Sequence, residues 1–324
     1  MKQLRIILAV LVLGVGLAAC GDDDDNGGGQ ADTGGQTTAS QQIQSNPDNS
    51  KTTITVGSKN FTEQKILGEI FAQGFEAAGY TVKKELNLGD EKTALAAVEG
   101  GDIDAYPEYT GTALLSFFGV KSDEIPKDPK TAFEQAKQGF ADKKLTAFPP
   151  TPFTSSNEVA ITKETQDKLG GITKISQLAD KDQDLTLYGS PECRQRLDCL
   201  LGLQQVYGLD FKRFVPVAID LRHQVLEQGK ADVSIVFTTD PQIKRNGEVL
   251  LEDDKGMFPP YNSTLVVRDD VVQKAGADLP KVIEQVEKGL TDDVMQELNA
   301  RVDLDKKTPE QVAREYLQES GLVS

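Results

Sequence analysis

The chain has 324 residues, with 51 acidic residues against 35 basic ones, three cysteines, one histidine and no tryptophan. The formal charge of −16 argues against a groove that binds nucleic-acid phosphates through clustered lysines and arginines. The single histidine, His223, excludes any metal site with two histidine ligands and leaves one candidate base for serine or cysteine catalysis. We expect His223 to be a partly exposed residue at the start of a helix, and we expect no metal or cofactor.

Residues 1–20 are typical of a bacterial secretion signal. Lys2 and Arg5 form a short positive region, and residues 6–17 form an apolar run that is too short for a stable membrane-spanning helix. The signal ends in Leu-Ala-Ala-Cys, which resembles the lipobox of bacterial lipoproteins, where the cysteine receives a diacylglyceryl group. The resemblance implies lipidation of Cys20; the alternative is an ordinary secretory signal that contains a cysteine by chance.

Residues 21–50 have the composition of a flexible tether. They are rich in Gly, Asp, Gln, Ser and Thr, contain no lysine or arginine, and have almost no apolar side chains to bury. Such a segment cannot offset the entropy cost of folding, so we expect it to be disordered. Together with the lipobox, it predicts an extracytoplasmic protein that is anchored by lipid to the bacterial cell membrane.

The two remaining cysteines, Cys193 and Cys199, are six residues apart. Outside the cytoplasm an oxidising environment permits a disulfide, which would stiffen this short loop. A reactive or metal-binding pair is less well supported, because no histidine or third cysteine lies nearby in the sequence.

From residue 52 on, strands and helices alternate. Strands are predicted at 52–58 and 81–88 and from 102, with helices between them whose apolar residues recur at helical spacing. The pattern repeats between 185 and 240, and the chain ends in two helical segments at 279–290 and 291–302. This order predicts an α/β fold with parallel strands. It fits either two Rossmann-like domains or a two-lobed binding protein. Because no G-x-G-x-x-G follows the first strand and no phosphate-binding loop occurs, nothing favours nucleotide binding.

Two segments, GSKNFTEQKILGEI (57–70) and DIDAYPEYTGTAL (102–114), resemble the substrate-binding proteins of osmoprotectant ABC transporters, which bind glycine betaine, choline, carnitine and related solutes. The likeness continues in order through most of residues 52–324. It implies a type II periplasmic-binding-protein fold, with two α/β lobes, a ligand cleft and two crossover hinge segments. Lobe 1 would comprise 52–154 plus 257–324, and lobe 2 would comprise 155–256. It also implies a monomeric binding subunit that is not an enzyme and that delivers its solute to permease subunits.

The resemblance also implies a ligand site. A quaternary ammonium cannot donate hydrogen bonds, so it is held by aromatic faces, while a ligand carboxylate is held by cationic or hydroxyl donors. The family's cage positions fall on Tyr109, Tyr261 and Phe237, and a polar contact falls on Lys59. A pocket hydroxyl and the carboxylate-binding arginine fall on Thr112 and Arg196.

Glu158 stands where relatives have a fourth cage tyrosine. A carboxylate here can supply the countercharge for a cation, which would favour choline or a solute whose positive group donates hydrogen bonds. It can instead form a salt bridge with Arg196 or Arg194 and never reach the ligand. The alternatives are therefore the same fold binding a basic amino acid or a betaine-like thione, or an extracellular ligand sensor.

Overall fold

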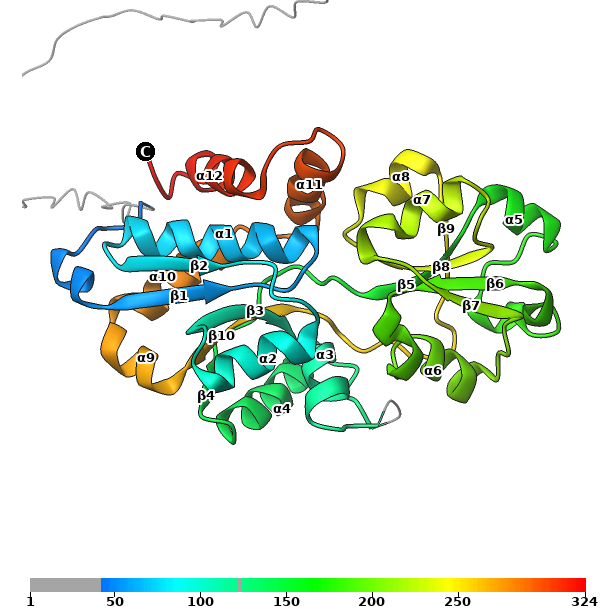
Figure 1. Ribbon diagram of the computed structural model, residues 1–324, viewed down its shortest axis with the longest axis horizontal. Helices are drawn as coiled ribbons and strands as arrows, with labels where there is room; N and C mark the ends of the chain where they lie inside the picture. Colours follow the sequence, from blue (N-terminus) through cyan, green and yellow to red (C-terminus); the bar gives the residue numbers. More distant parts are fainter. Residues whose placement is uncertain (1–41, 122–123) are drawn as a thin grey trace, which may run out of the picture. The chain divides into compact units, whose positions relative to one another are not determined.

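The computed structural model of the chain describes residues 42–121 and 124–324 (Figure 1). The predicted signal peptide, the lipidation site Cys20 and residues 21–41 of the predicted tether lie outside the described residues. Within the two described ranges, no helix is long and apolar enough to cross a membrane.

Residues 42–50 belong to the folded protein, so the predicted tether boundary at residue 50 is wrong. Pro47–Lys51 form a 3-10 helix (η1). Ile43 is buried, and its backbone N–H donates to the carbonyl oxygen of Leu322 over 2.9 Å. Asn49 is also buried. The polar composition of the whole segment hid these few anchoring residues.

The first sheet has the strand order β2-β1-β3-β10-β4. β1 runs parallel to β2 and β3, whereas β10 lies antiparallel between β3 and β4. We call the part of the protein built on this sheet lobe 1. Its strands are β1 (Thr53–Gly57), β2 (Thr81–Glu85), β3 (Ala105–Tyr109), β4 (Leu145–Ala147) and β10 (Ser263–Arg268). Its helices are α1 (Thr62–Ala77), α2 (Glu91–Gly100), α3 (Thr110–Thr112), α4 (Pro129–Ala141), α9 (Asp269–Ala275), α10 (Asp278–Glu287), α11 (Asp292–Asp303) and α12 (Pro309–Glu319), with a π-helical turn η2 at Ala113–Phe117.

The second sheet has the strand order β7-β6-β8-β5-β9, and we call the part built on it lobe 2. β6 runs parallel to β7 and β8, whereas β5 is antiparallel to β8 and β9. Its strands are β5 (Asn157–Ile161), β6 (Thr186–Gly189), β7 (Arg213–Pro216), β8 (Val233–Phe237) and β9 (Val249–Leu251). Its helices are α5 (Lys163–Lys168), α6 (Leu200–Gly202), α7 (Arg222–Glu227) and α8 (Pro241–Asn246), a π-helical turn η6 (Leu203–Tyr207), and the 3-10 turns η3 (Ile175–Leu178), η4 (Asp182–Asp184), η5 (Pro191–Gln195) and η7 (Ile219–Leu221).

The chain passes between the lobes twice. The two crossover segments pair with each other through an antiparallel bridge between Thr154 and Asn262, and the backbone N–H of Ser155 donates to the carbonyl oxygen of Tyr261 over 3.1 Å. The expected α/β fold with two crossover segments is confirmed. Lobe 2 is thus an insertion between β4 and β10 of lobe 1.

Helix α1 shows how the sequence places a site residue. Its apolar residues at helical spacing, including Ile66, Ile70 and Phe71, are fully buried, and the helix packs on β1 and β2 (Figure 1). The helix stops at Gly79, whose φ of +94° places it in the left-handed region that glycine tolerates. The packing of this helix fixes the position of Phe61, the residue just before its first turn.

Candidate ligand-binding site

A cavity between the lobes lies where several strands end. Lys59 follows β1, Tyr109 ends β3, Ser190 follows β6 and Phe237 ends β8, and all four residues line the cavity. The carboxyl ends of parallel strands are the usual place for a ligand in open α/β sheets. Six of the seven predicted contact residues line this cavity, namely Lys59, Tyr109, Thr112, Arg196, Phe237 and Tyr261.

Four aromatic rings line the cavity: Phe61 and Tyr109 from lobe 1, Phe237 from lobe 2, and Tyr261 from the second crossover segment. The Phe61 and Tyr109 rings are stacked, with centroids 6.3 Å apart and an interplanar angle of 20°. Phe61 also meets Phe237 of the other lobe, with centroids 5.4 Å apart. The sequence prediction missed Phe61, although its place just before the first turn of a helix that follows a strand could have indicated it.

The Tyr109 ring already makes a cation–π contact with a side chain of the protein itself. The ammonium of Lys59 lies 4.6 Å from the Tyr109 ring centroid and forms a buried ion pair with Glu108. The Tyr109 hydroxyl donates to Glu63 Oε1 over 2.6 Å. Burial raises the pKa of Glu63, and burial also raises the pKa of Glu108 in spite of the neighbouring Lys59. Lys59 is therefore held between a carboxylate and a ring.

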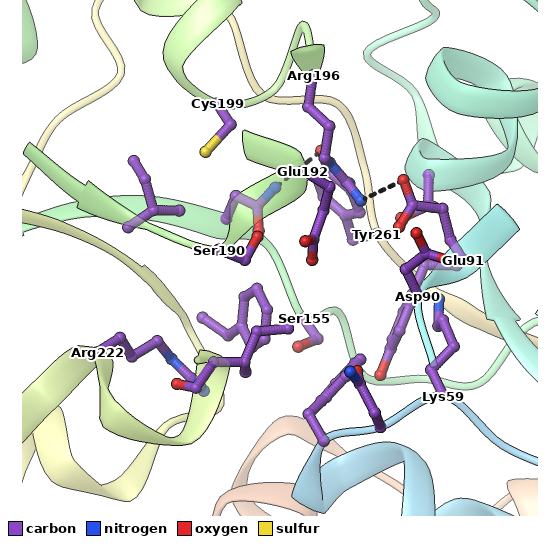
Figure 2. A pocket seen from close by; sticks show the side chains of 18 of the residues that line it. Lys59, Asp90, Glu91, Ser155, Ser190, Glu192, Arg196, Cys199, Arg222 and Tyr261 are labelled. Carbon is purple, nitrogen blue, oxygen red and sulfur yellow. Dashed lines mark hydrogen bonds and ion pairs between the residues drawn. The ribbon is translucent and has the colours of Figure 1, made fainter. Parts of the chain in front are cut away.

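Arg196 is held by two carboxylates. Its Nε and Nη2 donate to Asp198 over 2.8 and 2.6 Å, and its Nη1 lies 3.1 Å from Glu91 of lobe 1, so this pair joins the lobes (Figure 2). The Tyr261 hydroxyl also donates to Asp198, as does Asn157 Nδ2 over 3.0 Å. Burial opposes ionisation of Asp198, but the Arg196 guanidinium outweighs it and lowers the pKa of that carboxyl.

Arg222 is the third cation of the cavity, and Asp240 holds it in place. Its Nε and Nη2 donate to the two oxygens of Asp240, and its Cζ lies 4.5 Å from the Phe237 ring centroid. His223 places Nε2 2.9 Å from Asp240 and Nδ1 2.8 Å from Glu248. Burial favours the neutral imidazole, but these carboxylates outweigh it and raise the pKa of His223. His223 does lie in the first turn of α7, yet it is only 4% exposed, so the predicted partial exposure is wrong.

The cysteines of lobe 2 are joined. Cys193 and Cys199 form a disulfide, with Cα atoms 5.1 Å apart. The closed loop contains Arg196 and Asp198, and Cys199 itself lines the cavity. Glu192, immediately before the loop, lines it too. The disulfide thus fixes the segment that brings charged side chains from lobe 2 to the cavity.

Glu158 does not line the cavity, so its predicted place at the ligand is wrong. It lies on β5 beside Asn157, which does line the cavity, and successive residues of a strand point to opposite faces. Among the ion pairs of the described chain, none joins it to Arg196 or Arg194. Burial and the nearby Asp253 raise the pKa of Glu158 to about 7.

We expect Glu158→Gln to stabilise the protein by about 3 kcal/mol at pH 8 and to change little at pH 4. The carboxyl ionises near pH 4.5 in the unfolded chain but near pH 7 in the folded protein, so the folded state binds more protons between these values. The free energy of unfolding therefore falls as the pH rises through this range, and glutamine removes that loss. Urea unfolding of both proteins across this range measures the difference, and a difference independent of pH would contradict the assignment.

The two α/β lobes, the paired crossover segments and the cavity between the lobes define a two-lobed solute-binding protein of type II. The crystal structure of a glycine betaine/carnitine/choline ABC transporter is similar, with a TM-score of 0.65 and 28% identity over 82% of this chain and 98% of that one. Residues 52–319 match the family OpuAC, the substrate-binding domain of ABC-type glycine betaine transport systems, and the chain belongs to this family. The resemblance stated from the sequence is confirmed.

Two similar proteins are named for different solutes, ergothioneine and glycine betaine. The ergothioneine transport permease/ergothioneine binding protein EgtU of Helicobacter pylori is 32% identical over 83% of this chain, which spans only 48% of that longer relative. A glycine-betaine-binding protein of Pseudomonas aeruginosa is 34% identical over 84% of this chain and 89% of its own length. Family membership confirms that the chain is a transport protein and not an enzyme.

Proposed function

We propose that this protein captures a quaternary-ammonium solute, such as glycine betaine, choline or carnitine, and delivers it to an ABC importer. The observation that carries the proposal is the set of four aromatic rings, Phe61, Tyr109, Phe237 and Tyr261, that line one cavity between the lobes. A trimethylammonium group offers no hydrogen-bond donor, so ring faces and carboxylates are the protein groups that attract it. The importer's permease and ATP-hydrolysing parts would be other chains.

Ligand capture would couple to closure of the lobes. The cavity takes Phe61 and Glu91 from lobe 1 and Phe237 and Arg196 from lobe 2, and contacts join these residues across the cleft. A ligand that touches both lobes binds the closed form better than the open form, and this difference in affinity shifts the equilibrium. The permease would recognise the closed form.

The same proposal places the protein outside the cytoplasm, as a monomer with a lipid anchor at Cys20. The support is the signal-like segment with its Leu-Ala-Ala-Cys end and the polar residues that follow it. Labelling of expressing cells with a fatty-acid probe tests it: wild type incorporates the label, and Cys20→Ser does not.

Ergothioneine, a betaine that carries a thione ring, is the second candidate. It is favoured by the relative named as an ergothioneine-binding protein. Its ring would need polar partners besides the aromatic rings, and Ser155, Asn157 and Ser190 also line the cavity.

Isothermal titration calorimetry of residues 21–324, stripped of bound ligand by unfolding and refolding with the disulfide intact, tests the function. The panel is glycine betaine, choline, carnitine, proline betaine, ergothioneine, arginine and histidine. We expect at least one trimethylammonium compound to bind with a Kd on the order of micromolar, the range of about −8 kcal/mol. Binding of arginine or histidine alone would overturn the proposed ligand class and leave the fold assignment intact.

A further inference from the structure

The positive side chains that line the cavity already have carboxylate partners. Lys59 pairs with Glu108, Arg196 pairs with Asp198 and Glu91, and Arg222 pairs with Asp240. Each of these cations is largely buried, with side-chain exposures of 5%, 17% and 10%. A carboxylate on a ligand would have to compete with these pairs, because the donors that face it are in use.

Two carboxylates of the cavity lack a cationic partner. Glu192 of lobe 2 forms no ion pair or side-chain hydrogen bond within residues 42–121 and 124–324, and Figure 2 shows its carboxylate projecting toward the middle of the cavity. Asp90 of lobe 1 caps α2, with Oδ1 accepting from the Thr93 backbone N–H over 2.9 Å and from the Thr93 hydroxyl over 2.6 Å. These hydrogen bonds outweigh the effect of burial and lower the pKa of Asp90, which keeps it ionised.

The surplus charge at the cavity is therefore negative and comes from both lobes. Glu108, Asp198 and Asp240 neutralise the three cations one for one. The carboxylates of Asp90 and Glu192, and that of Glu91, which shares Arg196 with Asp198, are then in excess. These carboxylates attract a cationic group of a ligand. Among the described lining residues, no unpaired lysine or arginine is left to bind an anionic group of the same ligand. Opposite charges attract most strongly where water is partly excluded, as it is between two closing lobes.

We propose that Glu192, assisted by Asp90, is a specificity-determining residue that makes the cavity select solutes with a net positive charge, such as choline, over zwitterions with the same trimethylammonium head. The inference rests on the proposed function and narrows its ligand class. From the sequence, Glu158 was expected to supply the countercharge for a cationic ligand. In this proposal Glu192, which lines the cavity, supplies it instead.

Calorimetry with three matched compounds tests this. Choline and glycine betaine share the trimethylammonium head and differ in net charge, and 3,3-dimethylbutan-1-ol has the shape of choline without its charge. We expect wild type to bind choline at least about tenfold more tightly than glycine betaine and to bind the neutral alcohol weakest. Glu192→Gln should weaken choline binding by about tenfold and change the Kd for glycine betaine by less than about threefold. The preference for choline over glycine betaine should therefore shrink.

The control is Glu164→Gln, which removes the same charge from an exposed helix of lobe 2, where Glu164 pairs with Lys168. It should leave the choline to glycine betaine ratio unchanged. A wild type that binds glycine betaine as tightly as choline, or a ratio that Glu192→Gln does not alter, would overturn the inference while the proposed function stands. Failure of both choline and glycine betaine to bind would overturn the inference, and the proposed function would fall with it only if no quaternary-ammonium compound of the full panel binds.

Discussion

Replacing Phe237 with alanine should weaken the binding of a quaternary-ammonium solute by about a hundredfold. A desolvated cation–π contact contributes about 2 kcal/mol and the buried ring area about 1 kcal/mol more, and each 1.4 kcal/mol is a factor of ten in Kd. Phe237 also contacts Phe61 across the lobes, so the truncation removes a contact that favours the closed form.

Phe237→Tyr is the matched control, because it keeps the ring and should stay within about fivefold of wild type in the same titration. The alanine variant should unfold at nearly the temperature of wild type, because Phe237 is only partly buried. An alanine variant that retains wild-type affinity would remove Phe237 from the ligand site and leave Phe61, Tyr109 and Tyr261 as the remaining candidates.

Replacing Asp240 with asparagine should cost about 3 kcal/mol of stability and lower the unfolding temperature by about 8 °C. Asp240 is 4% exposed and accepts hydrogen bonds from Arg222, His223 and the backbone N–H of Phe237. Asparagine keeps the size of the side chain but leaves buried positive charge without its countercharge. Calorimetric or circular-dichroism melting at neutral pH measures the effect.

The same carboxylate predicts a loss of stability in acid. Burial opposes its ionisation, but Arg222 and His223 outweigh burial and lower the pKa of Asp240 from 3.8 to about 2. Its contribution is therefore complete above pH 3.8 and is lost as the pH falls toward 2. Asp167→Asn, which removes an exposed partner of Lys163, is the control and should change stability by less than about 0.5 kcal/mol. A loss below about 1 kcal/mol for Asp240→Asn would contradict the role assigned to this pair of cations.

The parallel strands of lobe 1 could be predicted because each follows a local rule. β1 is a β-branched run, β2 begins with Thr81 and Val82, and a helix with clear periodicity separates the two strands; such a strand–helix–strand order favours a parallel pair. The antiparallel strands β5 and β10 follow no such local rule, because they pair with strands far away in the chain. Only the family resemblance indicated the crossover segments that precede them.

The site residues were predicted from the family resemblance and not from a local rule. The structure places Tyr109 and Phe237 at the ends of strands, at the edge of each sheet where the cavity lies. The error at Glu158 is a register error of one residue, because on a strand the neighbouring Asn157 takes the opposite face. Ion pairs such as that between Arg196 and Glu91 join the two lobes and have no signature in sequence spacing.

Because residues 42–51 pack on lobe 1, both ends of the described chain lie on the same lobe. Ile43 is hydrogen-bonded to Leu322, so both ends of the described chain belong to lobe 1, while the backbone enters and leaves lobe 2 only through the two crossover segments. A force or a label applied at either end therefore acts on lobe 1 alone. A fluorescence experiment with dyes near residues 42 and 324 would not register lobe motion. One dye on an exposed position of α5 and one near the C-terminus would report it directly.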